Sequence, residues 1–337
     1  MLAAVVEKPG QFVVKEVETP TINSEQVLVK VHAASICNAT DNHILHGIFD
    51  GFHDRYPQIL GHEVCGEVVE IGEDVKGTLK LGQRIVMYTP WGAFCEYITF
   101  YPKQQTFAIV PENIPSKVAT CCEMFDGAFL GTVYPARIVK DENVLIIGAG
   151  PMGLTTMAGA KVYAKTVSVV DLVQFRLDKA KEMGADYIYN HSEMTADEIV
   201  AAIAKTTGLV DVVIMCIAED RSPNLDAFDM GAKALKYNGR MTSLVVAVKD
   251  IEKRYRLNPF LIISKDIQFK HSLNECHLDR NAIFQMAVDY VGEGKIKMEK
   301  VITHEICLDE LPDALKMCDN DLDKVIKVIV YPKLSGK

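Results

Sequence analysis

The stretch Val144-Leu145-Ile146-Ile147-Gly148-Ala149-Gly150-Pro151-Met152-Gly153 decides the fold of this 337-residue chain. An apolar run leads directly into three glycines at the spacing G-x-G-x-x-G, and a helical run over residues 154–164 follows. The glycines let the backbone approach a pyrophosphate, and the N-terminus of the helix faces its negative charge. Pro151 suits the first helical turn, where no N–H group is needed. We therefore predict a dinucleotide-binding turn whose contacts come from Gly148, Gly150, Pro151, Met152 and Gly153.

The strand expected next, over residues 166–170, ends at Asp171, about twenty residues after the glycines. An acidic side chain at this place hydrogen-bonds the adenosine ribose and repels a 2′-phosphate. The sequence therefore favours NAD as the cofactor. Arg176 keeps NADP open as the alternative, because an arginine near this position can bind a 2′-phosphate.

Strands and helices continue to alternate after Asp171. A helix that starts near Phe175 ends at Gly184, and apolar strands follow it. Such repetition is typical of a parallel, doubly wound sheet. The strands that we expect here cover residues 187–190, 210–216 and 242–248.

The chain has a different pattern before residue 124. Short β runs are separated by Gly, Pro and Asn, which is typical of a compact and mostly antiparallel β domain. The expected strands cover residues 3–6, 12–17, 26–34, 64–71, 84–88 and 93–99. Near the C-terminus we expect helices over residues 279–291 and 309–318, and short strands over 301–304 and 325–330.

Metal-ligand side chains gather around the stretch Gly61-His62-Glu63-Val64-Cys65-Gly66. Together with Cys37 and Glu123 it offers a thiolate, an imidazole and two carboxylates, from which zinc can take a four-coordinate site with one open position. The alternative is a surface histidine beside a solvated glutamate. The metal site is favoured because the surrounding glycines present His62 on a tight turn that leads into a strand.

The pattern Gly61-His62-Glu63, Gly66, Gly72 and Val75 resembles the zinc signature of the zinc-dependent medium-chain dehydrogenases. It is most similar to the polyol (sorbitol-like) and sugar dehydrogenase branch, and the resemblance covers nearly the whole chain. It implies an α/β fold with a discontinuous, mostly β, GroES-like catalytic domain at residues 1–124 and 272–337. A doubly wound Rossmann domain would occupy residues 125–271. The resemblance also implies a homodimer or a homotetramer.

The resemblance assigns roles to the stretch from Cys37 to His43. It implies that Cys37 is a zinc ligand and that Asp41 fixes the orientation of a ligating imidazole. Thr40 and His43 would pass the substrate proton toward solvent. This chain has two residues between Cys37 and Thr40, where the family usually has one. The alternatives are that Thr40 and Asp41 cap the short helix that begins there, and that His43 is simply solvated.

The resemblance also implies the carboxylate ligands. In the polyol branch a glutamate, usually followed by proline, occupies the place of Glu123, and here Met124 follows it. Cys121 and Cys122 are rival ligands, because the alcohol dehydrogenase branch uses a cysteine in this region. Glu63 and Glu123 would alternate with water or substrate in the remaining position.

A second, structural zinc is not expected. Many relatives insert a lobe with four closely spaced cysteines, whereas this chain has only Cys95 in the stretch from residue 87 to residue 97. Cys95 is then better interpreted as a core residue. The prediction is one catalytic zinc ion and no structural zinc.

Composition excludes several classes of partner. The net charge of −9 and the pI near 5.5 disfavour nucleic acid and anionic membrane surfaces, which need a basic field. The most apolar stretch, residues 144–154, is too short to span a bilayer, and the N-terminus lacks a signal-peptide pattern. Nine cysteines, mostly isolated, fit a reducing compartment, so we expect a cytoplasmic protein.

Together these observations predict an enzyme that transfers a hydride between NAD and a secondary alcohol of a polyol, sugar or similar compound. Thr40, His43 and Glu63 are its expected catalytic residues. The substrate pocket would involve residues 42–56, Trp91 and Asn274. The alternatives are a metal-independent NAD(P)H reductase of the same fold and a non-catalytic NAD-binding protein.

Overall fold

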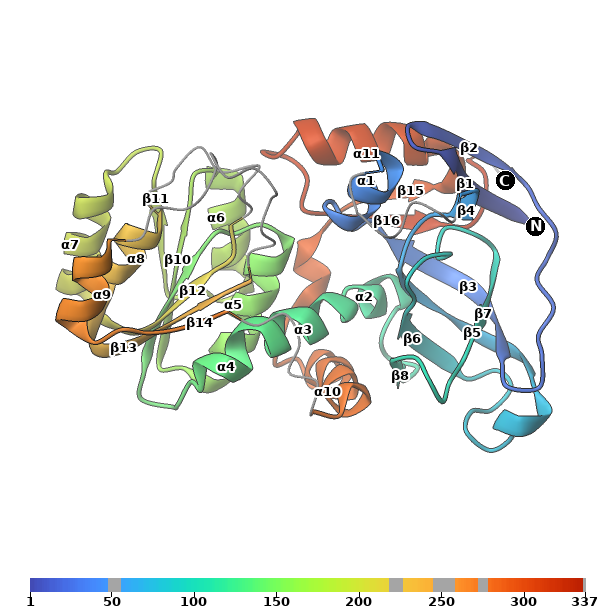
Figure 1. Cartoon of the computed structure of the whole chain (residues 1–337), viewed down its shortest axis with the longest axis horizontal. Helices are drawn as coiled ribbons and strands as arrows, with labels where there is room; N and C mark the ends of the chain where they lie inside the picture. Colours follow the sequence, from blue (N-terminus) through green and yellow to red (C-terminus); the bar gives the residue numbers. More distant parts are fainter. Residues whose placement is uncertain (48–55, 218–226, 245–257, 272–277, 336–337) are drawn as a thin grey trace. The chain divides into compact units, whose positions relative to one another are not determined.

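The computed structural model describes residues 1–47, 56–217, 227–244, 258–271 and 278–335. The chain divides into two compact units (Figure 1). Unit 1 contains Met1–Glu123, Asp279–Gly294 and Val301–Lys337, and unit 2 contains Met124–Leu278 and Lys295–Lys300. Asn274 and residues 48–55 of the expected substrate pocket lie outside the described residues.

Unit 2 is built around a parallel sheet, in the order β11-β10-β9-β12-β13-β14. The strands are β9 (Asn143–Ile147), β10 (Thr166–Asp171), β11 (Tyr187–Asn190), β12 (Val210–Met215), β13 (Leu235–Ser243) and β14 (Gln268–His271). Every residue of β9 is buried, because helices cover both faces of the sheet (Figure 1). The strand order reverses between β9 and β12, so the predicted doubly wound sheet is confirmed.

The helices of unit 2 connect these strands. They are α5 (Pro151–Tyr163), α6 (Gln174–Met183), α7 (Ala196–Thr206), α8 (Ala227–Ala234) and α9 (Pro259–Lys265). Helix α3 (Glu123–Ala128), the π-helical η3 (Phe129–Val133) and α4 (Tyr134–Ala136) precede β9. Helices α5 and α6 pack on β9, β10 and β11, whereas α8 packs on β12 and β13. Thr195 and Glu198 begin α7 with a reciprocal capping box.

The strand predicted over residues 242–248 begins earlier than predicted. The observed strand β13 begins at Leu235, and residues 245–257 lie outside the described residues. Gly239 suggested a turn before the strand. Instead, Asn238 takes a positive φ of 59°, and the pairing register shifts between Val210 and Val212, so the strand continues through the glycine.

Unit 1 contains two β sheets. The smaller has the order β2-β1-β4 and the larger β15-β16-β3-β5-β6-β8, with β7 pairing to β3. The strands are β1 (Leu2–Lys8), β2 (Gln11–Glu16), β3 (Val27–Ser35), β4 (Gln58–Ile59), β5 (Glu63–Ile71), β6 (Arg84–Tyr88), β7 (Tyr97–Phe100), β8 (Phe107–Ile109), β15 (Ile302–Cys307) and β16 (Lys327–Tyr331). Except for β15 with β16, these strands pair antiparallel, as predicted.

Short helices complete unit 1. They are α1 (Thr40–Leu45), α2 (Ser116–Thr120), α10 (Arg280–Gly292) and α11 (Leu311–Asn320), with the 3₁₀ turns η2 (Glu73–Val75), η5 (Met298–Val301), which crosses the unit boundary, and η6 (Leu308–Glu310). The core of the unit joins residues from both ends of the chain, including Val31, Val64 and Val328. The C-terminal strand β16 thereby lies between β15 and β3 in the larger sheet.

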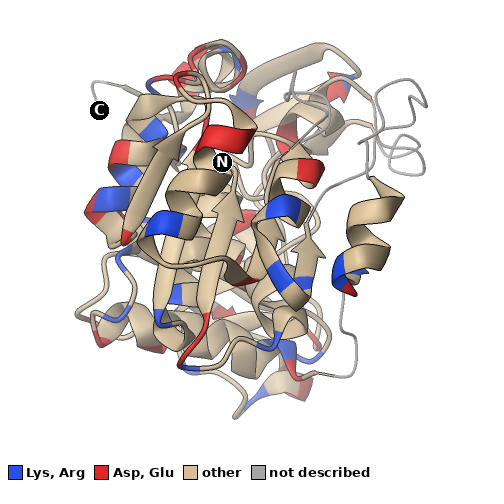
Figure 2. Cartoon of the chain, turned by 90° about the vertical axis from the view of Figure 1, so that its left-hand side faces the viewer, with Lys and Arg blue, Asp and Glu red and all other residues tan. Residues whose placement is uncertain are grey.

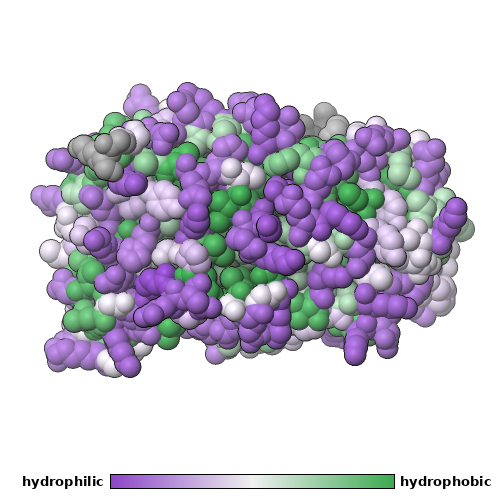
Figure 3. All heavy atoms as spheres, turned by 180° about the vertical axis from the view of Figure 1, so that it is seen from behind, coloured by the Kyte–Doolittle hydropathy of each residue, from purple (hydrophilic) through white to green (hydrophobic). Residues whose placement is uncertain are grey.

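The surface mixes polar and apolar groups. Figure 2 shows acidic and basic residues interspersed over the face that it presents. In Figure 3, seen from behind, hydrophobic atoms form smaller areas among hydrophilic ones. None of the described helices combines the length and the apolar character that crossing a membrane requires.

Candidate metal centre and cofactor site

A tight turn presents His62 and Glu63 at the start of β5. Gly61 has a φ of +91°, and a Cβ atom there would lie 2.9 Å from the Phe94 ring, so only glycine fits without strain. Glu63 is the first residue of β5, and Cys37 follows the end of β3. Because β3 and β5 pair antiparallel with Ser35 opposite Glu63, the sheet brings Cys37 to the same edge.

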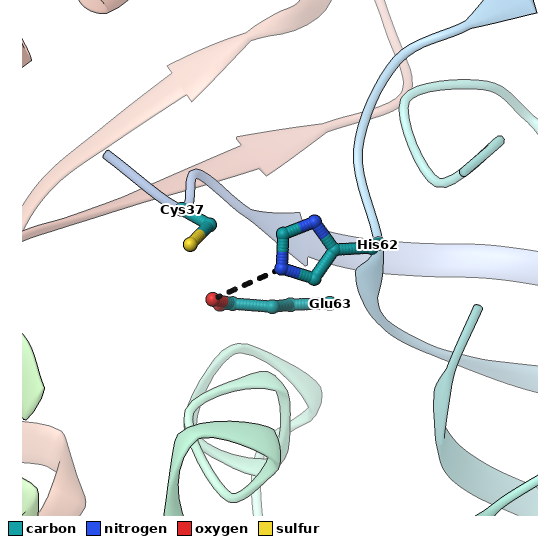
Figure 4. A group of neighbouring side chains, drawn as sticks. All are labelled: Cys37, His62 and Glu63. Atoms are coloured by element: carbon teal, nitrogen blue, oxygen red, sulfur yellow. Dashed lines mark ion pairs between the residues drawn. The ribbon is translucent and has the colours of Figure 1, made fainter. Parts of the chain in front are cut away.

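Cys37, His62 and Glu63 converge on one point. One ligand atom from each of the three lies within 4.8 Å of the others. Their sulfur, imidazole nitrogen and carboxylate point toward one another (Figure 4). His62 and Glu63 are 6% and 1% exposed, which rules out the alternative of a surface histidine beside a solvated glutamate. Zinc binds these three donor types at about 2.0–2.3 Å, so the donor set fits that ion.

The field at this point favours positive charge. Burial alone would lower the pKa of His62, but the neighbouring Cys37 and Asp41 raise it well above its usual range. Asp41 Oδ1 lies 3.4 Å from His62 Nδ1, the ring nitrogen on the side away from Glu63, and Asp41 is fully buried. Asp41 is therefore placed to orient the imidazole, as carboxylates behind metal-bound histidines do.

Lys327 and Ser35 complete the cluster, and the sequence analysis did not identify either. Lys327 Nζ lies 2.7 Å from Glu63 Oε1 and 2.8 Å from the carbonyl oxygen of Ile36, and Ser35 Oγ donates to Glu63 Oε2. Burial would lower the pKa of Lys327, but the charges of Glu63, Cys37 and Cys121 raise it. A signal was present, because Lys327 interrupts an otherwise apolar run from Val325 to Val330.

The other expected ligands are not part of this converging group. Among the described residues, the converging group does not include Glu123, which begins α3 and is half-buried. The rival ligands Cys121 and Cys122 are completely buried and are not in the group either. Burial raises the pKa of Cys121 to about 12, so its thiol stays protonated at neutral pH without a metal.

Thr40 and His43 both lie on α1, three residues apart. The N-cap of this helix is Ala39, which makes no side-chain cap, so the alternative that Thr40 caps the helix is wrong. The Asp41 carboxylate instead accepts the backbone N–H of Cys37 at 2.8 Å. Thr40 Oγ1 lies 3.4 Å from Cys37 Sγ. His43 is half-buried.

The glycine turn of unit 2 leaves no room for side chains. A Cβ atom on Gly153 would lie 1.9 Å from the carbonyl oxygen of Gly148, and one on Gly148 would lie 2.6 Å from that of Cys216. Gly150 is the N-cap of α5 without a side-chain cap, and Pro151 follows it in the first turn. The turn thus lies where the strand order reverses, at the carboxyl ends of β9 and β12, where doubly wound sheets bind ligands.

Asp171 and Arg176 flank this turn. Asp171 Oδ2 accepts the N–H of Ala149 at 2.6 Å, and Oδ1 accepts the N–H of Val173 at 2.9 Å. A guanidinium nitrogen of Arg176 lies 3.8 Å from where a Cβ of Gly150 would be. Asp171 therefore holds the glycine turn in shape and places a negative charge beside it.

Comparison with known proteins gives two family matches. Residues 23–145 match the alcohol dehydrogenase GroES-like domain, and residues 151–289 match the zinc-binding dehydrogenase family. The first match, together with the doubly wound sheet, confirms the predicted combination of a GroES-like and a Rossmann domain.

Individual relatives of this chain are also dehydrogenases. The L-threonine 3-dehydrogenase of Vibrio vulnificus (strain CMCP6) is 30% identical over 70% of this chain and 74% of its own length. The sorbitol dehydrogenase of Bacillus subtilis (strain 168) is 25% identical over 98% of this chain and 97% of its own. The crystal structure of the alcohol dehydrogenase RspB from Escherichia coli CFT073, complexed with NADH, aligns with a TM-score of 0.82 at 25% identity. The alignment covers 98% of this chain and 99% of the RspB chain.

We predict that Lys327→Met destabilises unit 1 by about 3–5 kcal/mol, because it leaves the buried Glu63 carboxylate without its cation. The double variant Lys327→Met, Glu63→Gln should be more stable than Lys327→Met alone. The free energy of unfolding can be followed by the fluorescence of Trp91, the only tryptophan, which lies in unit 1. The control Lys117→Met, which breaks an exposed ion pair, should cost no more than about 1 kcal/mol. If Lys327→Met and Lys117→Met lost the same free energy of unfolding, Lys327 would not be the cation that stabilises the buried carboxylate of Glu63.

Proposed function

The chain belongs to the zinc-dependent medium-chain dehydrogenases, in the branch that contains polyol dehydrogenases, and is an oxidoreductase of the alcohol and polyol type. On this basis we propose that it uses one zinc ion and NAD to oxidise a secondary alcohol of a polyol, an amino alcohol or a diol. The observation that carries the proposal is the convergence of Cys37, His62 and Glu63 in a buried, anionic setting.

We propose that Cys37, His62 and Glu63 hold the metal. Zinc, when bound, supplies a Lewis acid that lowers the pKa of a substrate hydroxyl. Asp41 keeps the imidazole of His62 in one orientation, and Ser35 and Lys327 do the same for the carboxylate of Glu63. Glu123 stays a candidate for the exchangeable fourth position.

Proton release is assigned to helix α1. His43 is half-buried there, and an imidazole gains and loses protons readily near neutrality. We propose that His43 passes the alcohol proton to solvent. The sequence prediction also included Thr40 in this relay.

Unit 2 would bind the cofactor. NAD supplies the hydride acceptor, and the protein contributes position and charge. We propose that the backbone of Gly148, Gly150 and Gly153 receives the pyrophosphate, with Pro151 and Met152 in the same turn. The carboxylate of Asp171 would face the adenosine ribose and disfavour a 2′-phosphate. Arg176, beside Gly150, would border the same site.

We further propose a homo-oligomer. In the described part of the sheet, β14 is the last strand and pairs with β13 on one side only. Phe260 and Ile263 of the neighbouring α9 are 72% and 78% exposed, and Phe269 of β14 is 44% exposed. An open strand edge with exposed apolar side chains is a surface that a second copy of the chain can cover.

A cytoplasmic location is proposed from cysteine chemistry. The cysteines that the structure describes are all free thiols. Thiols persist in this state in a reducing compartment, whereas oxidising compartments favour disulfides.

We predict that Cys37→Ser and Glu63→Gln each lower zinc content at least about tenfold and abolish NADH production, whereas Glu123→Gln retains zinc. Elemental analysis measures the metal, and circular dichroism checks the fold. Activity should be screened on alditols, inositols, threonine and simple diols, with and without a chelator. Turnover that survives complete removal of zinc would favour the metal-independent reductase. NADH binding without turnover on any alcohol would favour the non-catalytic protein.

The carboxylate of Asp171 should determine cofactor choice. Asp171→Asn keeps an acceptor for the turn but removes the charge, so the ratio of kcat/KM for NAD to that for NADP should fall about tenfold. Asp178→Asn on the exposed side of α6 is the matched control and should leave the ratio unchanged. An unchanged ratio in Asp171→Asn would remove this residue from the proposed site.

The oligomer can be tested by light scattering. The protein should have the mass of a dimer or a tetramer of 37.4-kDa chains. Ile263→Glu should lower this mass toward that of a single chain. Leu81→Glu, at an exposed apolar position of unit 1, serves as the control and should keep the assembly. A single-chain mass for the unchanged protein would refute the proposal.

A further inference from the structure

The Cys37 thiol donates a hydrogen bond to the hydroxyl oxygen of Thr40. Thr40 Oγ1 and Cys37 Sγ are 3.4 Å apart, which is within hydrogen-bond distance for sulfur. In the described part of the chain, this sulfur is the hydrogen-bond partner of the Thr40 hydroxyl. The contact therefore joins a residue expected in a proton relay to a residue of the converging metal-ligand group.

The spacing of the two residues explains the contact. Asp41 donates its N–H to the carbonyl oxygen of Cys37 at 3.1 Å, so residues 37–41 form one helix-like turn. Side chains three residues apart on such a turn face each other, whereas those two apart do not. The second intervening residue, Ala39, thus brings Thr40 into line with Cys37.

The turn is held from both sides. Cys37 donates its own N–H to Asp41 Oδ2 at 2.8 Å, and the fully buried Asp41 also contacts His62. Asn42, the next residue, donates to Asp319 of α11 at 2.9 Å. These contacts fix the backbone that carries both the hydroxyl and the sulfur.

A cysteine that binds zinc does so as a thiolate, which has no hydrogen to donate, so the contact can then persist only with Thr40 as the donor. We propose that Thr40 is a positioning residue that, in this state, donates its hydroxyl hydrogen to the Cys37 thiolate and thereby tunes the metal. A hydroxyl has one hydrogen to donate, so it cannot at the same time donate to a substrate oxygen or to His43. A hydrogen bond to a thiolate withdraws electron density from the sulfur, and the bound ion becomes a stronger Lewis acid. This inference rests on the proposed zinc function, and it leaves His43 to carry the substrate proton without Thr40.

The test uses the full-length protein loaded with cobalt(II) in place of zinc, because a cobalt thiolate has a charge-transfer band that reports on the sulfur. In Thr40→Val the sulfur becomes more electron-rich, so this band should move to longer wavelength. Thr40→Ser keeps a hydroxyl and should restore the position of the band. Metal affinity, measured by competition with a chromogenic chelator, should fall about tenfold or more in Thr40→Val.

Thr120→Val is the matched control. Thr120 is buried and lies beside the sulfur of Cys121 at 3.9 Å, but Cys121 is not in the converging group. The charge-transfer band of the cobalt-loaded Thr120→Val variant should keep its wavelength. If Thr40→Val loses kcat while the band and the metal affinity are unchanged, Thr40 acts on the substrate proton and the inference is overturned. If the unchanged protein binds neither zinc nor cobalt, the proposed function itself fails, which is a distinguishable result.

Discussion

The negative charge of Glu63, buried beside Cys37 and His62, is the constraint on which the rest of the site depends. An isolated carboxylate in such a place would be strongly unfavourable, because it has lost its hydration. Lys327 neutralises one side of it, and Ser35 donates a hydrogen bond. The remaining side faces the sulfur of Cys37 and the ring of His62. A divalent cation bound at that point would balance the charges of the Cys37 thiolate and of Asp41, which Lys327 leaves uncompensated.

Strand pairing brings these groups together. In the larger sheet of unit 1, β16, β3 and β5 are neighbours, with Ile329 opposite Ser35 and Ser35 opposite Glu63. The pairing therefore carries Lys327, which is 264 residues from Glu63 in the chain, to the edge where His62 and Cys37 lie. The C-terminal strand is thus part of the proposed metal centre as well as of the core. Unit 2 contains a separate feature of its own, a glycine turn whose shape depends on the carboxylate of Asp171.

The sequence predicts the parts of this arrangement that are local. The glycines after an apolar run predict the glycine turn of unit 2, and the ligand types around Gly61 predict the group of Cys37, His62 and Glu63. The role of Lys327 depends on which strands pair, and no local pattern contains that information. Glu123 stays a prediction from the resemblance, because it begins α3 and is not part of the converging group. The start of β13 was misplaced because Gly239 is accommodated within the strand, where a turn was expected.

If a sulfur, an imidazole and a carboxylate of this chain bind one zinc ion, the ion has a single sulfur neighbour. X-ray absorption at the zinc edge of the freshly purified protein counts the sulfur atoms around the ion. We expect one zinc per chain, with a single sulfur at about 2.3 Å and nitrogen or oxygen atoms at about 2.0–2.2 Å. A protein without zinc, or a zinc ion surrounded by four sulfurs or by none, would contradict this expectation.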